Sequence, residues 1–91
     1  MPTYRFLVRG RVLGVGFRQF VRRSADRLGI RGEVWNRIDG NVEGVASHAD
    51  PGVLQQFLES LKDGPGRVDD LQSWNEPDVG SWTGFEIGFT R

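Results

Sequence analysis

Two different spacings of apolar residues follow one another at the start of the chain. Tyr4, Phe6 and Val8 alternate with Arg5 and Arg9, and a period of two is typical of a strand with one buried face. From Phe17 to Leu28 the apolar residues fall three or four positions apart, which predicts an amphipathic helix. Gly29 follows directly, and glycine is the usual residue for a left-handed helix end.

A glycine-rich segment separates these two elements. Residues 10–16 contain three glycines in seven positions, which argues against regular structure throughout, so we predict a loop. After the helix, residues 30–36 and 41–47 are predicted strands. Asp39-Gly40 between them has the composition of a hairpin turn.

The second half predicts a second helix and two more strands. Asp50 is typical of an N-cap and Pro51 of a first helical position, and apolar residues at helical spacing run from there to Gly64-Pro65. Residues 68–74 and 85–89 are the last predicted strands. A turn-rich connection joins them.

The predicted order is therefore strand, helix, strand, strand, helix, strand, with a further strand at the end. Two helices packed on one face of an antiparallel sheet give an α+β fold, here the ferredoxin-like βαββαβ sandwich. No repeat, linker or low-complexity tract interrupts residues 1–91. We therefore expect a single domain.

Composition removes several kinds of chemistry. The 91 residues include no cysteine and one histidine, His48, so thiolate chemistry is excluded and a zinc site is not expected. A Ser-His-Asp triad would need His48, and the chain has no Gly-x-Ser-x-Gly turn. We interpret His48 as a surface residue and expect neither a metal nor a cofactor.

The chain also lacks the features of membrane and exported proteins. No apolar run approaches the roughly 20 residues that span a bilayer. Arginines recur from the N-terminus onward, so the apolar region of a secretory signal is missing. We expect a soluble, cytoplasmic protein.

The net charge is zero, but it is unevenly distributed. Residues 1–31 hold eight arginines and one acid, and the rest of the chain holds four basic and eleven acidic residues. Such asymmetry can indicate an anionic partner. We interpret Arg22, Arg23 and Arg27 as a solvated helix face. The adjacent acids Asp69-Asp70 are expected to point to opposite faces of their strand, where they are solvated.

Nucleic acid is not an expected partner. The tryptophans at positions 35, 74 and 82 could stack on bases, but the pattern of an RNA-binding sheet is absent.

The glycine-rich loop remains as candidate chemistry. It is not a Walker loop, because Gly16 is followed by Phe-Arg rather than Lys-Ser/Thr. Free N–H groups in the first helical turn and the helix dipole form an anion site. Gly14 and Gly16 allow the backbone to approach the anion closely. Arg18 adds a planar guanidinium that can grip two oxygens of one phosphoryl group.

Several motifs stand in a specific order along the chain. They are Val8-Arg-Gly-Arg-Val-Leu-Gly-Val-Gly-Phe-Arg18, Leu28-Gly29, Gly32-Glu-Val-Trp-Asn36, Asp39-Gly-Asn-Val-Glu43 and Gly64-Pro65. Together they closely resemble the acylphosphatase family, from about Tyr4 to the C-terminus. The resemblance implies the ferredoxin-like fold and a hydrolase of acyl phosphates that uses no metal or cofactor.

The resemblance also implies site residues and ligands. Arg18 matches the phosphate-binding arginine, and Asn36 matches the residue that positions the attacking water. The phosphate-binding amides would be those of Gly14, Val15, Gly16, Phe17 and Arg18. Expected ligands are a small-molecule acyl phosphate and, as competitors, inorganic phosphate and sulfate, and the family implies a monomer.

Three positions differ from the family's usual pattern. Leu13 stands where the family usually has glutamine, which changes the side-chain hydrogen bonding of the loop. The family's second strand usually reads Gly-Trp/Tyr-Val-Arg-Asn. Here Glu33 stands in place of the Trp or Tyr, and Trp35 in place of the Arg. These two residues flank Asn36 without replacing it. For Leu13 we expect an effect on the rate rather than on the reaction.

Two alternatives stay open. One is a non-catalytic, anion-binding module, because ferredoxin-like domains also serve as ligand sensors. The other is the acylphosphatase-like domain of larger carbamoyl-phosphate-handling proteins. Those proteins continue into cysteine-rich zinc modules, whereas this chain ends soon after its last predicted strand. The presence of both Arg18 and Asn36 favours catalysis.

Overall fold

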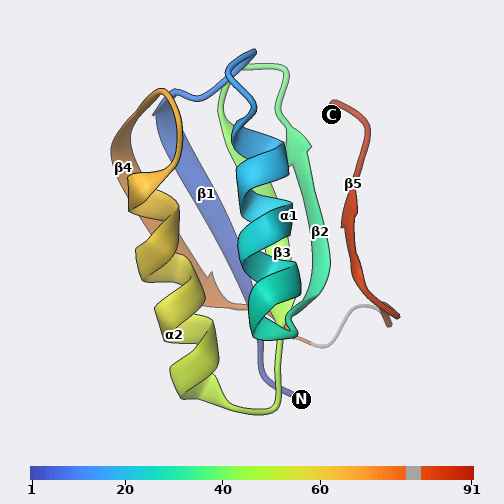
Figure 1. The fold of residues 1–91 in the computed structure, drawn as a ribbon. Helices are drawn as coiled ribbons and strands as arrows, with labels where there is room; N and C mark the ends of the chain where they lie inside the picture. Colours follow the sequence, from blue (N-terminus) through green and yellow to red (C-terminus); the bar gives the residue numbers. More distant parts are fainter. Residues whose placement is uncertain (78–80) are drawn as a thin grey trace.

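The computed structural model describes residues 1–77 and 81–91, and residues 78–80 of the predicted connection lie outside the described residues. Figure 1 shows the helices and strands in the predicted order, including the predicted strand at the end of the chain. They are β1 (Thr3–Arg11), α1 (Phe17–Leu28), β2 (Arg31–Asn36), β3 (Val42–Ser47), α2 (Pro51–Ser60), the 3-10 turn η1 (Leu61–Asp63), β4 (Arg67–Asn75) and β5 (Phe85–Ile87).

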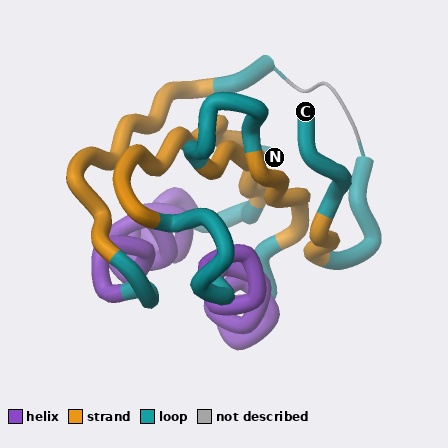
Figure 2. Tube along the Cα trace, turned by 90° about the horizontal axis from the view of Figure 1, so that it is seen from above, coloured by secondary structure: helices purple, strands orange, loops and turns teal. Residues whose placement is uncertain are grey.

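The five strands form one sheet in the order β4-β1-β3-β2-β5. Both helices cover the same face of this sheet, which leaves the other face open (Figure 2). The ferredoxin-like α+β prediction is therefore confirmed. The first four strands pair antiparallel, as predicted. However, β5 pairs parallel with β2, so the complete sheet is mixed.

The apolar core lies between the sheet and the two helices. Phe57 of α2 makes edge contacts with Phe6 of β1 and Phe85 of β5, at ring-centroid distances of 5.7 and 6.0 Å. Helix α1 buries Phe17 and Val21, one turn apart. The apolar residues whose spacing predicted the helix thus face the core. Each fully buried side chain of this size stabilises the folded state by about 1.5–3 kcal/mol.

The helix ends follow the predicted local chemistry. Gly29 ends α1 in the left-handed conformation, with φ of 69°. Asp50 caps α2, because its carboxylate accepts a hydrogen bond of 2.8 Å from the amide of Gly52. Among the described residues, no helix is both long enough and apolar enough to span a membrane.

Strand β1 is longer than its alternating pattern indicated. Gly10 and Arg11, which we predicted as loop, pair with Val68 and Arg67 of β4. This part of the loop prediction is wrong, because a neighbouring strand supplies hydrogen bonds that local composition does not reveal. The irregular loop begins only after Arg11.

A bulge in the β1–β4 pairing changes the faces of β4. The register shifts between Arg9 and Gly10, and Val68 and Leu71 both pack against the core although three positions separate them. Asp69-Asp70 between them are both exposed and therefore share the outer side. The prediction that they point to opposite faces is wrong, because a bulge interrupts strict alternation.

Candidate active site

The loop that precedes α1 and the end of β2 lie at the same end of the sheet (Figure 1). A cavity of about 110 Å³ opens between them. This volume suits one small anion, since pockets for drug-sized ligands measure about 300–1,000 Å³. The cavity is lined by Val12, Gly14, Gly16, Phe17, Arg18, Gln19, Asn36 and Ile87.

The backbone N–H groups of this loop are free of hydrogen-bond partners within the described residues. Gly14 and Gly16 have φ of 75° and 80°, a region that other residues enter only with strain. Within residues 1–77 and 81–91, the amides of residues 14–19 donate no hydrogen bond to another residue. Free amides and the positive end of a helix dipole are the groups that can hold an anion at a helix start, so we call residues 14–18 the candidate anion cradle.

Arg18 lies in the first turn of α1 and lines the same cavity. Its side chain is half-buried, and it forms no ion pair with any acid in the described part of the chain. The first turn of α1 also carries no acidic side chain. The guanidinium is therefore available to an anion in the cradle, where its planar shape allows two parallel hydrogen bonds.

Asn36 ends β2 and pairs with Val42 of β3. The residue is only 8% exposed, yet its side-chain amide makes no hydrogen bond to a described residue. No fully buried side-chain nitrogen or oxygen of the described residues lacks a partner. The side-chain amide atoms of Asn36 are therefore not fully buried, and because the residue lines the cavity, this amide is available to hydrogen-bond a small molecule there.

Most of the residues predicted from the sequence line the cavity, but one does not. Of the five cradle residues, only Val15 is absent from the cavity lining. Its side chain is 43% exposed, and its Cγ2 lies beside Gly66. Sequence reasoning missed the lining residues Val12, Gln19 and Ile87. Gln19 follows Arg18 in the first helical turn, a position that could have indicated it.

His48 lies apart from this cavity. Its Nδ1 accepts a hydrogen bond of 2.9 Å from the backbone amide of Asp50, so the residue supports the start of α2. It does not line the cavity with Arg18 and Asn36. The described residues also contain no group of three or more His, Cys, Asp or Glu placed to hold a metal ion.

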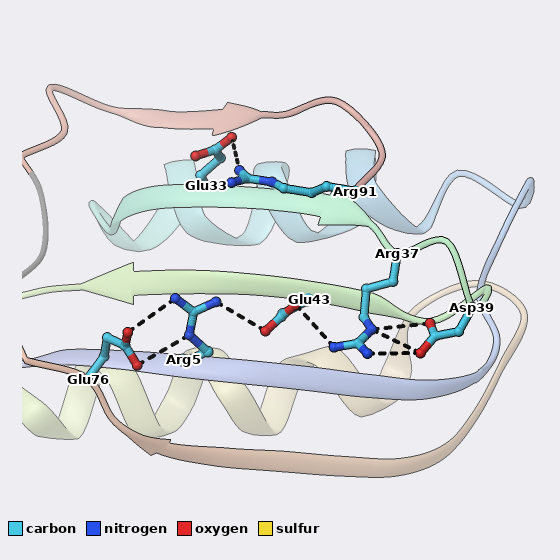
Figure 3. Close-up of polar contacts among 7 residues, drawn as sticks. All are labelled: Arg5, Glu33, Arg37, Asp39, Glu43, Glu76 and Arg91. Atoms are coloured by element: carbon cyan, nitrogen blue, oxygen red, sulfur yellow. Dashed lines mark hydrogen bonds and ion pairs between the residues drawn. The ribbon is translucent and has the colours of Figure 1, made fainter.

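A second, larger concavity of about 570 Å³ is lined by Arg5, Arg37 and Arg91. These arginines already form ion pairs with acidic side chains of the protein (Figure 3). Arg5 lies between Glu43 and Glu76, with nitrogen–oxygen distances of 3.1 Å to each. Arg37 pairs with Asp39 at 3.0 Å and with Glu43 at 3.3 Å. These carboxylates compete with any incoming anion, which makes this concavity the poorer phosphate site.

The pKa shifts of these groups agree with the pairing. The hydrogen bond to Glu76 raises the pKa of Arg5, against the opposing effect of burial. The hydrogen bond to Asp39 raises the pKa of Arg37 and, in return, lowers the pKa of Asp39. All three groups stay charged at neutral pH, so their ion pairs persist there.

The model of the family described as Acylphosphatase matches residues 4–87. The chain belongs to the acylphosphatase family. This confirms the resemblance inferred from the motifs around Arg18 and Asn36. Among the family's members, the acylphosphatase of Thermobifida fusca is 46% identical over 82 residues, which cover 87% of this chain and 88% of that protein.

Solved structures give the same family relationship. The crystal structure of acylphosphatase from Bacillus subtilis has a TM-score of 0.90 and 39% identity, and covers 97% of this chain and 99% of that chain. HypF of T. kodakarensis contains a similar unit, with a TM-score of 0.82 and 32% identity. That match covers 97% of this chain but only 12% of HypF.

Proposed function

We propose that this family member hydrolyses acyl phosphates to a carboxylate and inorganic phosphate at the cavity beside α1. The observation that carries the proposal is the meeting of three groups in one cavity. The cavity is lined by the loop residues Gly14, Gly16 and Phe17, whose amides are free, by Arg18 with its guanidinium, and by Asn36. The family relationship supports the same reaction.

The chemistry of the leaving group fits the groups that line the cavity. The reaction breaks a bond between phosphorus and a carboxylate oxygen, and the acid formed from that carboxylate has a pKa of about 4. Such a leaving group departs at neutral pH without a general acid. Catalysis then needs positioning and electrostatic stabilisation, which the loop and the arginine can supply.

Arg18 and the loop amides would hold the phosphoryl oxygens. In phosphoryl transfer the negative charge spreads over these oxygens in the transition state. N–H donors that are already oriented toward them need no rearrangement as the reaction proceeds. The amides of residues 14–18 would be such donors, because they are free of other partners and the left-handed Gly14 and Gly16 fix the course of the loop.

Asn36 would position the attacking water. Its side-chain oxygen can accept one hydrogen bond from water and so orient a lone pair toward phosphorus. Water adds to phosphorus as the carboxylate leaves, and the proton of the water ends on the phosphate product. An asparagine suits this role because it stays neutral and does not repel the negatively charged substrate.

Turnover of benzoyl phosphate tests the proposal directly. We expect release of benzoate and phosphate in steady-state assays, at the same rate with and without EDTA. The reason is that the proposed mechanism needs only the side chains and amides named above. Phosphate binding without turnover would instead identify a non-catalytic anion-binding module. A rate that EDTA abolishes and Mg²⁺ or Zn²⁺ restores would contradict the metal-independent mechanism.

Inorganic phosphate and sulfate should inhibit competitively and raise the melting temperature. A tetrahedral anion fills the same cradle as the phosphoryl group and stabilises only the folded state. At a ligand concentration 100 times Kd, this stabilisation is about 2.7 kcal/mol. Inhibition kinetics and thermal melts with phosphate, sulfate and acetate measure it. If millimolar phosphate produced neither inhibition nor a thermal shift, the loop at residues 14–18 would be only a turn.

A further inference from the structure

The backbone around Asn36 receives support from the far end of the chain. Strand β5 pairs with β2 only through Gly32–Val34, so this pairing stops before Asn36. The backbone amide of Arg91 continues it, because it donates a hydrogen bond of 2.9 Å to the carbonyl of Asn36. The carbonyl of Arg91 in turn accepts a hydrogen bond of 3.1 Å from the amide of Ile38. Arg91 thus brackets the end of β2.

The side chain of Arg91 anchors this bracket on β2 (Figure 3). Its Nη2 lies 2.7 Å from Oε2 of Glu33, and its guanidinium carbon lies 3.8 Å from the ring centroid of Trp35. An arginine over a tryptophan face gains both stacking and cation–π attraction. Because Trp35 is only 5% exposed, it provides a fixed surface for that contact.

The neighbouring residues provide little other anchorage. Phe89 is 94% exposed and Thr90 is also exposed, so neither buries a side chain against the sheet. One further backbone bond, from the amide of Gly88 to the carbonyl of Val34 at 2.8 Å, precedes them. Beyond Gly88, the position of the segment therefore depends on Arg91.

Asn36 needs such support because its side chain has no tether of its own. Its amide makes no hydrogen bond within the described residues, so the backbone at residues 35–37 determines where the amide points. A reacting group displaced by about 1 Å can lose up to 100-fold in rate. On β2, Glu33 and Trp35 face away from Asn36, because successive side chains of a strand point to opposite faces.

We propose that Arg91 is a positioning residue for Asn36, held in place by Glu33 and Trp35. The guanidinium binds one face of β2, and the backbone of the same residue fixes the strand end that presents Asn36 on the other face. Glu33 and Trp35 are the two positions at which β2 departs from the usual family pattern. That pattern has an arginine directly before the asparagine, and here an arginine reaches the same strand from position 91.

The variant Arg91→Ala tests this proposal, with Arg67→Ala as a matched control. Arg67 is also exposed and paired, with 2.8 Å to Asp69, but it lies on β4 at the other edge of the sheet. We expect Arg91→Ala to lower kcat roughly 3- to 10-fold. The phosphate inhibition constant should stay at its wild-type value, because Arg18 and the loop amides are untouched. The control should keep the wild-type kcat.

Two further variants separate positioning from general stability. Arg91→Lys keeps the charge but loses the planar stack, so it should recover only part of kcat. Glu33→Gln should reduce kcat less than Arg91→Ala does, and should add nothing when combined with it. These milder changes also carry the test if Arg91→Ala fails to fold. Side-chain amide resonances of Asn36 should shift in Arg91→Ala and not in the control.

This proposal rests on the proposed water-positioning role of Asn36. Measuring Asn36→Ala in the same series distinguishes a failure of that role from a failure of the role of Arg91. Wild-type turnover by Asn36→Ala would contradict the proposed function. A large loss in Asn36→Ala with wild-type kcat in Arg91→Ala, Arg91→Lys and Glu33→Gln would overturn only the role of Arg91. A lowered melting temperature as the sole defect of Arg91→Ala would also overturn it, as would equal losses in kcat and phosphate affinity.

Discussion

Arg18→Ala should keep the fold and lose most of its activity, with a rate reduction of about 10²–10³-fold. The side chain is half-buried at the cavity and forms no ion pair with a described residue, so its removal breaks no structural contact of that kind. It does remove a preoriented, charge-assisted donor from the phosphoryl group, a loss of about 3–4 kcal/mol in the transition state. Phosphate affinity should fall as well.

Arg18→Lys and Arg23→Ala are the informative companions. Lysine restores a point charge but not the planar fork, so it should recover only part of the lost rate. Arg23 is an exposed arginine of the same helix that does not line the cavity, so Arg23→Ala should behave as wild type. Measurements of kcat, KM and phosphate inhibition, with circular dichroism for the fold, decide the matter. Wild-type turnover by folded Arg18→Ala would refute the assignment.

Asn36→Ala should reduce kcat by at least about 100-fold while phosphate inhibition stays nearly unchanged. The anion is held by the loop and Arg18, whereas the water is held by Asn36, so the two measurements report different groups. A loss confined to kcat marks an interaction made mainly in the transition state. Asn41→Ala is the control, because Asn41 belongs to the same hairpin but does not line the cavity.

Asn36→Asp gives a sharper test of the same geometry. The carboxylate keeps the shape of the side chain but places a negative charge next to the phosphoryl group. Phosphate binding should therefore weaken together with turnover, and more strongly at low salt, where the repulsion is less screened. If Asn36→Ala kept the wild-type kcat, or showed only a lower melting temperature, the water-positioning role would be wrong.

Local sequence patterns predicted most of the fold because their causes are local. The helical spacing after Phe17, the left-handed Gly29 and the Asp50-Pro51 start each depend on a few neighbouring residues, and each is confirmed. The limits of β1 could not be predicted in the same way. Whether Gly10 and Arg11 are loop or strand depends on β4, which lies more than half the chain away in sequence.

Only one part of the candidate site could be predicted from the local sequence. The glycine-rich loop and Arg18 are adjacent in the chain, so their joint chemistry as an anion site follows from the order of residues alone. Asn36 has no such local signal, since an asparagine before a turn is common. The family resemblance singled it out, and the cavity that it shares with Arg18 exists only in the folded sheet.

By itself, the sequence determined the elements, the anion-binding loop and the family, because these follow from short-range spacing and motifs. Only the tertiary structure decided which distant groups meet. The order β1-β3-β2 brings Asn36 beside the loop that follows β1. The parallel pairing of β5 brings Arg91 over Trp35 and Glu33. Such contacts depend on strand order and register, which no local period along the chain encodes.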